Sequence, residues 1–355
     1  MILNIVNALR INSGGGLVYF SFLHNEIDKK NNFVFLDYRI KNNLKKFKYA
    51  RTVYVKNNLS GWFLILFFRS KFYIRNLIDS KLFNKSKILS EFCINGYPPF
   101  IRFPFIKSKI SILCQNKLIF AYDIKYFSFF QKVKYLYFYR ILFFLFLKNT
   151  DNLIVQTQTM KKIVEDNLKN QNVYLEDKFW RNLKINNFFN GLKNPENKNI
   201  KGIEIPISNF IESQLTFFYP SAFYPYKNHK NLIYAFKEIS EIFGNKIKLI
   251  LTLSKEDLPS SMKSFNFLFF TGKVNIFDIH AIYQRVDYLI FPSLLESLGL
   301  PLIEANLYDL PIICSRRDYV FDVCEPLLTF NPENIEEIKE SLREAVKNKL
   351  TSKEF

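Results

Sequence analysis

The second half of the 355-residue chain alternates short apolar runs with amphipathic stretches, and this alternation restricts its possible folds more than any other feature. The apolar runs have the length of buried strands, and the stretches between them carry apolar residues at helical spacing. Strands that alternate with helices are typical of a parallel sheet with helices on both faces. The expected strands are 215–219, 246–253, 265–271, 288–291 and 310–314, and the expected helices are 231–243, 278–285, 301–307 and 334–347.

The first half begins in the same way, with an apolar run, a Gly-containing turn and a helical stretch. A chain of this length exceeds the usual size of one domain. We therefore predict an α/β protein with two Rossmann-like, doubly wound domains. The elements expected in the first half are strands 2–8, 33–36 and 153–156, helix 18–23, a buried helix at 137–147 and an amphipathic helix at 160–168.

The boundary between the two domains is expected after an Asn-rich segment. Residues 186–200 combine many Asn residues with Gly and Pro, which is typical of a loop or an insertion. We place the hinge near Pro206, so the predicted domains are 1–205 and 206–355.

The two halves differ in charge. Residues 1–200 hold 33 Lys and Arg and 12 Asp and Glu, a net charge of +21, whereas the rest holds 17 and 20, a net charge of −3. Codon bias would enrich Lys throughout the chain, so the difference calls for a physical cause. One interpretation of the sequence pI of 9.5 is that the chain is a basic nucleic-acid-binding protein.

One segment carries the clearest chemistry. Residues 291–305 follow a predicted strand and open a helix, with Pro301 in the first turn and Glu296 and Glu304 on either side of it. The free amides of a helix N-terminus stabilise an anion such as a diphosphate. Carboxylates beside that anion are better suited to accept hydrogen bonds from sugar and ribose hydroxyls. The alternative is that both carboxylates are ordinary surface groups, one of them stabilising the helix dipole.

Glu296, seven intervening residues and Glu304, arranged around Gly-Leu-Pro, resemble the signature of glycosyltransferase family 4. The resemblance implies the GT-B fold, in which two Rossmann-like domains face each other across a cleft, and transfer with retention of anomeric configuration. It also implies roles. Glu296 would contact the transferred sugar, the amides of Gly299 and Leu300 the diphosphate or sugar, and Glu304 the ribose. Gly272 and Val274, in Phe-Thr-Gly-Lys-Val, resemble the family's turn beside the nucleotide base.

A second cluster, residues 224–235, resembles the family's donor-phosphate loop between the first strand and first helix of the C-terminal domain. Lys227 matches the phosphate-binding Lys and would compensate charge on the leaving diphosphate. The Arg that often precedes it in the family is replaced here by Ser221 and its neighbours, so Lys230 or Arg316 would have to complete the clamp. A solvated Lys227 is the alternative.

Two clusters in the first half complete the predicted site. The Gly14–Gly16 run after the first strand lets a ligand approach the backbone closely, so Gly15 and Gly16 are assigned to the donor, with a plain turn as the alternative. Many relatives place a His near the reacting sugar, but the corresponding residues 112–116 contain none. Gln115 and Asn116 are instead assigned to the sugar or acceptor, through amide hydrogen bonds.

The predicted function is transfer of a sugar, hexosyltransferase-like, from a nucleotide-diphosphate-sugar donor to a glycan or lipid-linked acceptor in cell-surface polysaccharide synthesis. We expect no cofactor and no metal, because the histidines lack metal-ligand spacing and no Asp-any-Asp motif occurs. A nucleotide-sugar epimerase of the same fold is the enzymatic alternative. A binding protein for nucleic acid is the alternative from another class, which the motif disfavours.

The location is predicted from apolar runs and charge. Residues 61–68 and 141–147 fall short of the roughly 20 residues that span a bilayer, and no cleavable leader is visible at Met1. We therefore expect a cytoplasmic protein, peripheral on the inner face of the membrane. Its basic half would dock on anionic lipid through lysines of 41–48, 81–87 and 107–134, with Phe127 to Phe130 inserted shallowly. The alternative is solvated lysines and buried phenylalanines.

Overall fold

The computed structural model describes residues 3–9, 11, 16–20, 23, 32–40, 51–56, 58, 60, 63, 65–67, 69–70, 89–102, 108–120, 127–169, 171–176, 214–274 and 279–352. These residues fall into two compact units. The first comprises Met1–Ile124 and Ser128–Phe179, and the second comprises Trp180–Phe355 with Lys125–Phe127. The predicted hinge near Pro206 lies outside the described residues, so the boundary between 205 and 206 stays a prediction.

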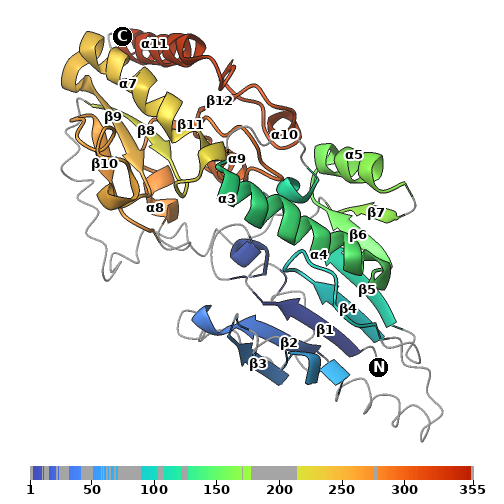
Figure 1. Ribbon diagram of the computed structural model, residues 1–355. Helices are drawn as coiled ribbons and strands as arrows, with labels where there is room; N and C mark the ends of the chain where they lie inside the picture. The colour runs from blue at the N-terminus through green and yellow to red at the C-terminus, as the bar shows by residue number, and fades with distance from the viewer. Residues whose placement is uncertain are drawn as a thin grey trace, which may run out of the picture. The chain divides into compact units, whose positions relative to one another are not determined.

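The first unit contains a fully parallel sheet with strand order β3-β2-β1-β4-β5-β6-β7. Chain order reverses between β1 and β4, which pair in parallel, so this sheet is doubly wound as predicted (Figure 1). Its strands are β1 (Leu3–Ala8), β2 (Asn32–Asp37), β3 (Arg51–Val55), β4 (Leu89–Cys93), β5 (Ser108–Leu113), β6 (Asn152–Val155) and β7 (Asn172–Leu175). The helical segments with defined bounds are η1 (Tyr38–Ile40), η2 (Lys117–Ile119), α3 (Phe129–Lys132), η3 (Val133–Phe138), α4 (Tyr139–Phe146), η4 (Leu147–Asn149) and α5 (Gln158–Asn167).

The second unit contains another parallel sheet, with order β10-β9-β8-β11-β12-β13 and its reversal between β8 and β11. All residues of the central strands β8, β11 and β12 are buried, as expected for strands covered on both faces. The strands are β8 (Leu215–Tyr219), β9 (Ile247–Leu251), β10 (Leu268–Phe270), β11 (Tyr288–Phe291), β12 (Ile312–Ser315) and β13 (Leu328–Phe330). The helical segments are η6 (Pro225–Lys227), α7 (His229–Phe243), η7 (Gly244–Lys246), η8 (Lys255–Asp257), α8 (Ile279–Tyr283), α9 (Leu300–Leu307), α10 (Asp318–Phe321) and α11 (Ile335–Ser352).

Helices cover both faces of the second sheet. α7 and α11 pack against each other on one face (Figure 1), where Lys339 of α11 pairs with Glu238 of α7 at 2.6 Å. α7 connects β8 to β9, which lies on one side of β8 in the sheet, whereas α9 connects β11 to β12, which lie on the other side. Because both crossovers in a parallel sheet are right-handed, α9 lies on the opposite face. The predicted doubly wound α/β architecture is therefore confirmed for both halves of the chain.

One predicted element is placed differently from the expectation. The stretch 137–147 is helical, but it is not a buried helix: Phe143 and Leu147 are buried, whereas Tyr137, Ile141 and Leu145 are each more than half exposed. The helix packs on its own unit through one face only. Apolar composition all round the helix led to the prediction of full burial, and the structure leaves its outer face uncovered.

A buried ion pair lies at the centre of the first unit. Arg69 donates from Nε to both carboxylate oxygens of Glu91 on β4, at 3.0 and 2.8 Å, and Nη2 lies 2.8 Å from Oε2. The two side chains are 3% and 1% exposed. Removing one partner of such a pair leaves an uncompensated buried charge, which is costly.

We predict that Glu91→Ala lowers the free energy of unfolding of the first unit by roughly 3–5 kcal/mol, because the Arg69 guanidinium keeps its charge without its partner. The matched control is Glu165→Ala, which removes the half-exposed partner of Lys161 on α5 and should change stability by less than about 0.5 kcal/mol. Urea titrations followed by circular dichroism measure both. Equal stability of the two variants would contradict a stabilising role for the buried pair.

Candidate functional site

The centre of the second unit brings two loops together at the carboxyl ends of adjacent strands. One loop follows β8 and leads to α7, and the other follows β11 and leads to α9. The amide of Leu294 donates to the carbonyl of Tyr226 at 2.8 Å, which joins the two loops. In open α/β sheets, ligands bind outside the carboxyl ends of the strands where strand order reverses. This end of β8 and β11 is that position.

The two loops carry the predicted catalytic pair. The Lys227 ammonium forms an ion pair and hydrogen bond with Oε1 of Glu296, and the side chains are 17% and 14% exposed. Ser293 Oγ donates to the same carboxylate oxygen at 2.6 Å. Lys227 Nζ also lies 5.5 Å from the ring centroid of Tyr226, a cation–π contact. Lys227 and Glu296, assigned separately to phosphate and sugar, are thus direct partners in the unliganded protein.

Three side chains that the sequence analysis missed hold this arrangement. Tyr219, the last residue of β8, donates from its hydroxyl to the carbonyl of Lys227 at 2.7 Å. Ser315 Oγ and the Tyr319 hydroxyl donate to the carbonyl of Ser293 at 2.8 and 2.9 Å. Burial raises the pKa of both tyrosines, so their hydroxyls stay protonated and remain donors. A buried Tyr at a strand end was the available signal for Tyr219, whereas Ser315 and Tyr319 carry no local one.

Gly299 and Leu300 open α9 as predicted. Gly299 has a left-handed φ of 73°, and a Cβ there would lie 3.0 Å from Cδ1 of Leu302, so both conformation and space favour glycine. Helix geometry leaves the Gly299 and Leu300 amides without intrahelical acceptors, and Pro301 has no N–H. These two amides and the positive end of the helix dipole can therefore stabilise an anion, and they follow Glu296 closely in the sequence, between β11 and the first turn of α9.

Glu304 lies one turn further along α9 and is only 5% exposed. The hydroxyl of Tyr283 on α8 donates to its Oε2 at 2.8 Å. Burial raises the pKa of the Glu304 carboxyl to about 7, and the Tyr283 hydrogen bond offsets part of that effect. The pKa of this carboxyl therefore lies near neutral pH.

The predicted base-contacting turn follows β10. The Gly272 amide donates to the carbonyl of Leu253 at 3.0 Å and its φ is 68°, so the turn is tied to the end of β9 and needs the left-handed conformation. Val274 lies two residues further and is partly exposed. Both residues lie beyond the carboxyl end of the same sheet as Lys227, as the assignment requires.

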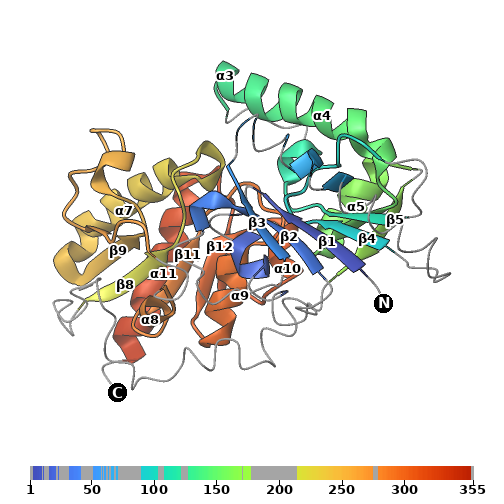
Figure 2. The same ribbon diagram turned by 90° about the horizontal axis from the view of Figure 1, so that it is seen from below.

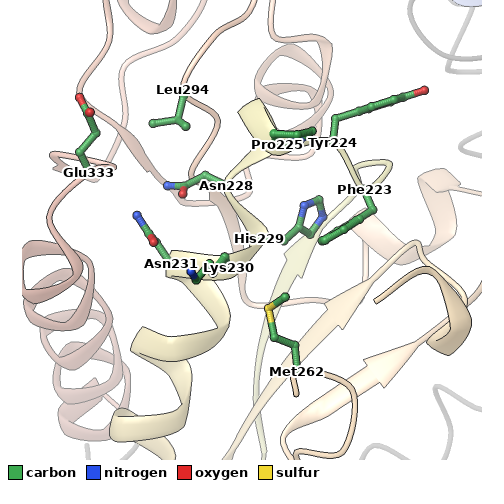
Figure 3. A pocket seen from close by; sticks show the side chains of 10 residues that line it. All are labelled: Phe223, Tyr224, Pro225, Asn228, His229, Lys230, Asn231, Met262, Leu294 and Glu333. Carbon is green, nitrogen blue, oxygen red and sulfur yellow. The ribbon is translucent and has the colours of Figure 1, made fainter. Parts of the chain in front are cut away.

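A cavity of about 490 Å³ lies at the N-terminus of α7 (Figure 3). Of the donor-binding residues predicted in this unit, only Lys230 lines the cavity. Lys227 and Glu296 are not among the lining residues, so the cavity and this ion pair do not coincide. We place the chemistry at the pair, because the strand-order reversal and the loop contacts converge there. The lining is Phe223, Tyr224, Pro225, Asn228, His229, Lys230, Asn231, Met262, Leu294 and Glu333.

His229, in the wall of this cavity, does not serve as a base. Its ring packs between Tyr219 and Phe223, with centroids 4.8 and 5.4 Å away, and it is 1% exposed. Burial, and to a smaller extent the Lys227 charge, lower its pKa to about 3. The ring is neutral at physiological pH and acts as a packing group.

The first unit brings two of its predicted residues together. A Cβ on Gly16 would lie 2.9 Å from Cδ1 of Ile11 and 3.5 Å from Oε1 of Gln115, so Gly16 and Gln115 are neighbours. Gln115 Nε2 donates to Oε1 of Gln156 at 3.3 Å. Asn116 Oδ1 accepts from the Leu118 amide at 3.1 Å and caps η2, so a structural role occupies that oxygen. Gly15 lies outside the described residues.

Within the part of the chain that the structure describes, no group of three or more His, Cys, Asp or Glu residues could hold a metal ion. The expectation of a metal-independent enzyme without a cofactor stays a prediction.

Comparison with known proteins identifies the second half of the chain. Residues 201–355 match the family model for Glycosyl transferases group 1. A probable sucrose-phosphate synthase 4 from Oryza sativa subsp. japonica is 28% identical over an alignment of 150 residues, which covers 35% of this chain and 14% of that protein. The chain thus spans only a small part of the length of this curated relative. The family match covers less than half of the chain, residues 201–355.

Solved structures resemble the whole chain. HepE from Anabaena, in complex with UDP and glucose, is 12% identical with a TM-score of 0.60, covering 99% of this chain and 91% of that one. Sucrose-phosphate synthase from Thermosynechococcus elongatus is 13% identical with a TM-score of 0.65, covering 98% and 90%. At these identities the likeness shows the fold, which is GT-B with two Rossmann-like domains. The fold predicted from the sequence is therefore confirmed.

We predict that Glu304 makes the stability of the second unit fall as pH rises. A carboxyl whose folded pKa is raised from 4.5 to about 7 takes up a proton on folding, so its stabilising contribution is lost between those values. Relative to wild type, Glu304→Gln should gain about 3 kcal/mol of unfolding free energy between pH 4.5 and pH 8. Urea titrations at both pH values measure this gain. A pH-independent difference between the two proteins would show that Glu304 titrates normally.

Proposed function

We propose, from the group 1 glycosyltransferase domain at residues 201–355, that this protein transfers a sugar from a nucleoside-diphosphate-sugar donor to an acceptor hydroxyl. The observation that carries the proposal is the Lys227–Glu296 pair at the strand-order reversal. It puts a cation for phosphate and a carboxylate for sugar hydroxyls at one point, on the loop that opens the anion-binding helix α9.

Different residues are proposed to bind different parts of the donor. Lys227 and the Gly299 and Leu300 amides are proposed to bind the diphosphate, since ammonium and helix N-terminal amides are anion-binding groups. Gly272 and Val274 would contact the base, Glu304 the ribose, and Lys230 would supplement the phosphate site. Gly15, Gly16, Gln115 and Asn116 of the first unit are proposed to complete the donor and acceptor contacts.

The reaction is proposed to proceed with retention and without a metal. As the bond from the anomeric carbon to the diphosphate breaks, negative charge develops on the leaving phosphate oxygen, and the Lys227 ammonium compensates it. The acceptor oxygen would form the new bond to the anomeric carbon on the face that the diphosphate leaves, and the same phosphate oxygen would accept the proton of the acceptor hydroxyl. For Lys227 to turn to the phosphate, Glu296 must release it, which frees the carboxylate to accept hydrogen bonds from the transferred sugar.

The proposed donor and acceptor classes rest on the ligands of similar structures and on the charge of the first half of the chain. The HepE structures contain UDP or UDP-glucose, so we propose a UDP-sugar as the first donor to test. We propose a glycan or lipid-linked saccharide as the acceptor, in cell-surface polysaccharide synthesis at the inner face of the membrane. The basic first half of the chain, with net charge +21 over residues 1–200, supports an anionic surface there.

A panel of nucleotides and nucleotide sugars tests the proposed function. A ligand at about 100 times its dissociation constant stabilises the folded state by about 2.7 kcal/mol, which gives a measurable rise in Tm. We expect UDP and a UDP-sugar to raise Tm, and slow hydrolysis of the sugar nucleotide in the absence of acceptor. An isomeric sugar nucleotide among the products would identify an epimerase. Retention on RNA with no response to any nucleotide would identify a nucleic-acid-binding protein.

We predict opposite effects on donor binding for the two members of the ion pair. Lys227→Ala should lower kcat/KM by an amount equivalent to roughly 1.5–3 kcal/mol of transition-state stabilisation, the range for a charge-assisted hydrogen bond. Glu296→Gln should lower kcat but tighten donor binding, because Lys227 no longer has to leave a carboxylate. Steady-state kinetics and calorimetry with the donor measure both.

The matched control for Lys227 is Lys237→Ala, which removes an exposed lysine of α7, the helix that follows Lys227, and should leave both constants unchanged. If Lys230→Ala rather than Lys227→Ala lowers kcat/KM, the phosphate-binding role belongs to Lys230. Weaker donor binding by Glu296→Gln would contradict competition between the carboxylate and the diphosphate.

A further inference from the structure

One helical stretch of the first unit is rich in apolar side chains. α3, η3, α4 and η4 follow one another without a break from Phe129 to Asn149 (Figure 2). η3 is a π-helical turn, a form that is rare and often found at functional sites. A helix that is hydrophobic all round needs an apolar environment on all sides, which in a globular domain means complete burial.

The inner face of this stretch is covered by the first unit. Phe143 and Leu147 are buried in a core cluster with Phe120 and Met160. The rings of Phe143 and Phe120 meet edge to face with centroids 5.5 Å apart. These contacts fix the helix on its unit and determine which face points outward.

The outer face is exposed and largely aromatic. Phe129 and Phe130 at its start are 74% and 83% exposed. Single exposed apolar residues are normal on a protein surface, but a continuous group of this kind marks an interaction site. We call this group the outer face; the further members that are at least 36% exposed are Val133, Tyr137, Phe138, Ile141, Phe144 and Leu145.

The charges around the outer face have one sign. Between Asp123 and Asp151 the sequence contains Lys125, Lys132, Lys134, Arg140 and Lys148 and no carboxylate. Lys148 is exposed, and Lys132 and Arg140 are partly exposed. Arg140 lies 5.7 Å from the ring centroid of Phe144, so cation and aromatic ring share this surface. Apolar side chains with cations at the same surface are complementary to an anionic lipid leaflet, which offers acyl chains and phosphates together.

We propose that the outer face inserts shallowly into an anionic lipid surface, with the helix lying in the plane of that surface. Among the described residues no helix is long and apolar enough to cross a bilayer. The helix is fixed to its sheet through Phe143 and Leu147, so insertion reaches only the side chains of the other face. This extends the expectation placed on Phe127 to Phe130: Phe129 and Phe130 belong to the surface, whereas Phe127 is 7% exposed and does not.

The inference rests on the proposed function and deepens it, because it identifies the surface that would hold a membrane-facing enzyme. Vesicle binding needs no sugar transfer, however, so failure of one leaves the other testable. The lysines of 41–48 and 81–87 lie outside the described residues.

Flotation of the full-length chain with vesicles tests the proposal. Equimolar phosphatidylglycerol and phosphatidylcholine vesicles should carry the protein upward, pure phosphatidylcholine vesicles should not, and salt above physiological strength should weaken binding. The triple variant Phe129→Ser/Phe130→Ser/Ile141→Ser should reduce partitioning by about tenfold or more, because it removes buried apolar surface from the lipid. Lys132→Glu/Lys148→Glu should also reduce it.

The matched control is Ile242→Ser/Phe321→Ser, which removes two side chains of the second unit that are 59% and 60% exposed, and should bind vesicles as wild type does. Circular dichroism and Tm establish that each variant is folded. A folded triple variant that floats like wild type would overturn the proposal, as would equal binding to neutral vesicles or none to either. A wild-type dimer that the triple variant converts to monomer, without vesicle binding, would assign the outer face to a second copy.

Discussion

The order of the strands in the second sheet is the constraint on which the site depends. Because chain order reverses between β8 and β11, the loops after these strands lead to opposite faces and leave the strand ends uncovered between them. The Leu294–Tyr226 backbone hydrogen bond then ties the loops together. The Lys227–Glu296 pair follows from that contact, since residues 69 positions apart meet only where the two strands are neighbours.

Burial explains the electrostatics of the same region. Tyr219 and Tyr319 are buried donors whose acceptors are the backbone carbonyls of Lys227 and Ser293, so they fix the loops through the main chain and leave the charged side chains available. Glu304 is buried with Tyr283 and titrates near neutral pH. The site therefore contains a paired carboxylate, Glu296, and a desolvated one, Glu304. Two carboxyls with different environments can take different roles toward one donor.

The two units use the same architecture but present different surfaces. The second unit concentrates polar contacts at its strand-order reversal, whereas the first carries a buried Arg69–Glu91 pair inside and an uncovered aromatic helix face outside. The net charge of +21 over the first 200 residues lies in the same half of the chain as that face, whereas the rest of the chain has a net charge of −3.

The sequence was most informative where apolar runs are short and uninterrupted. β8 and β11 were predicted to the residue, and α7 and α9 within two residues, because their ends are marked by Pro, Asn and Gly. β3, β4, β5, β7 and β13 were missed, since each is short and mixes polar with apolar residues, so no local pattern distinguishes them from loops. Glu296 and Glu304 were found through their spacing, but Tyr319 was not, because its partner Ser293 is 26 residues away.

The sequence by itself determined the fold class, most of the order of elements in the second half and the position of the motif between a strand and a helix, because these depend on patterns within one or two elements. Only the tertiary structure decided three further points: that Lys227 pairs with Glu296, that Glu304 is desolvated, and that the helix at 137–147 keeps an uncovered face. The reason is the same in each case. Pairing, desolvation and exposure depend on what other parts of the chain place nearby, and composition along one helix or loop does not contain that information.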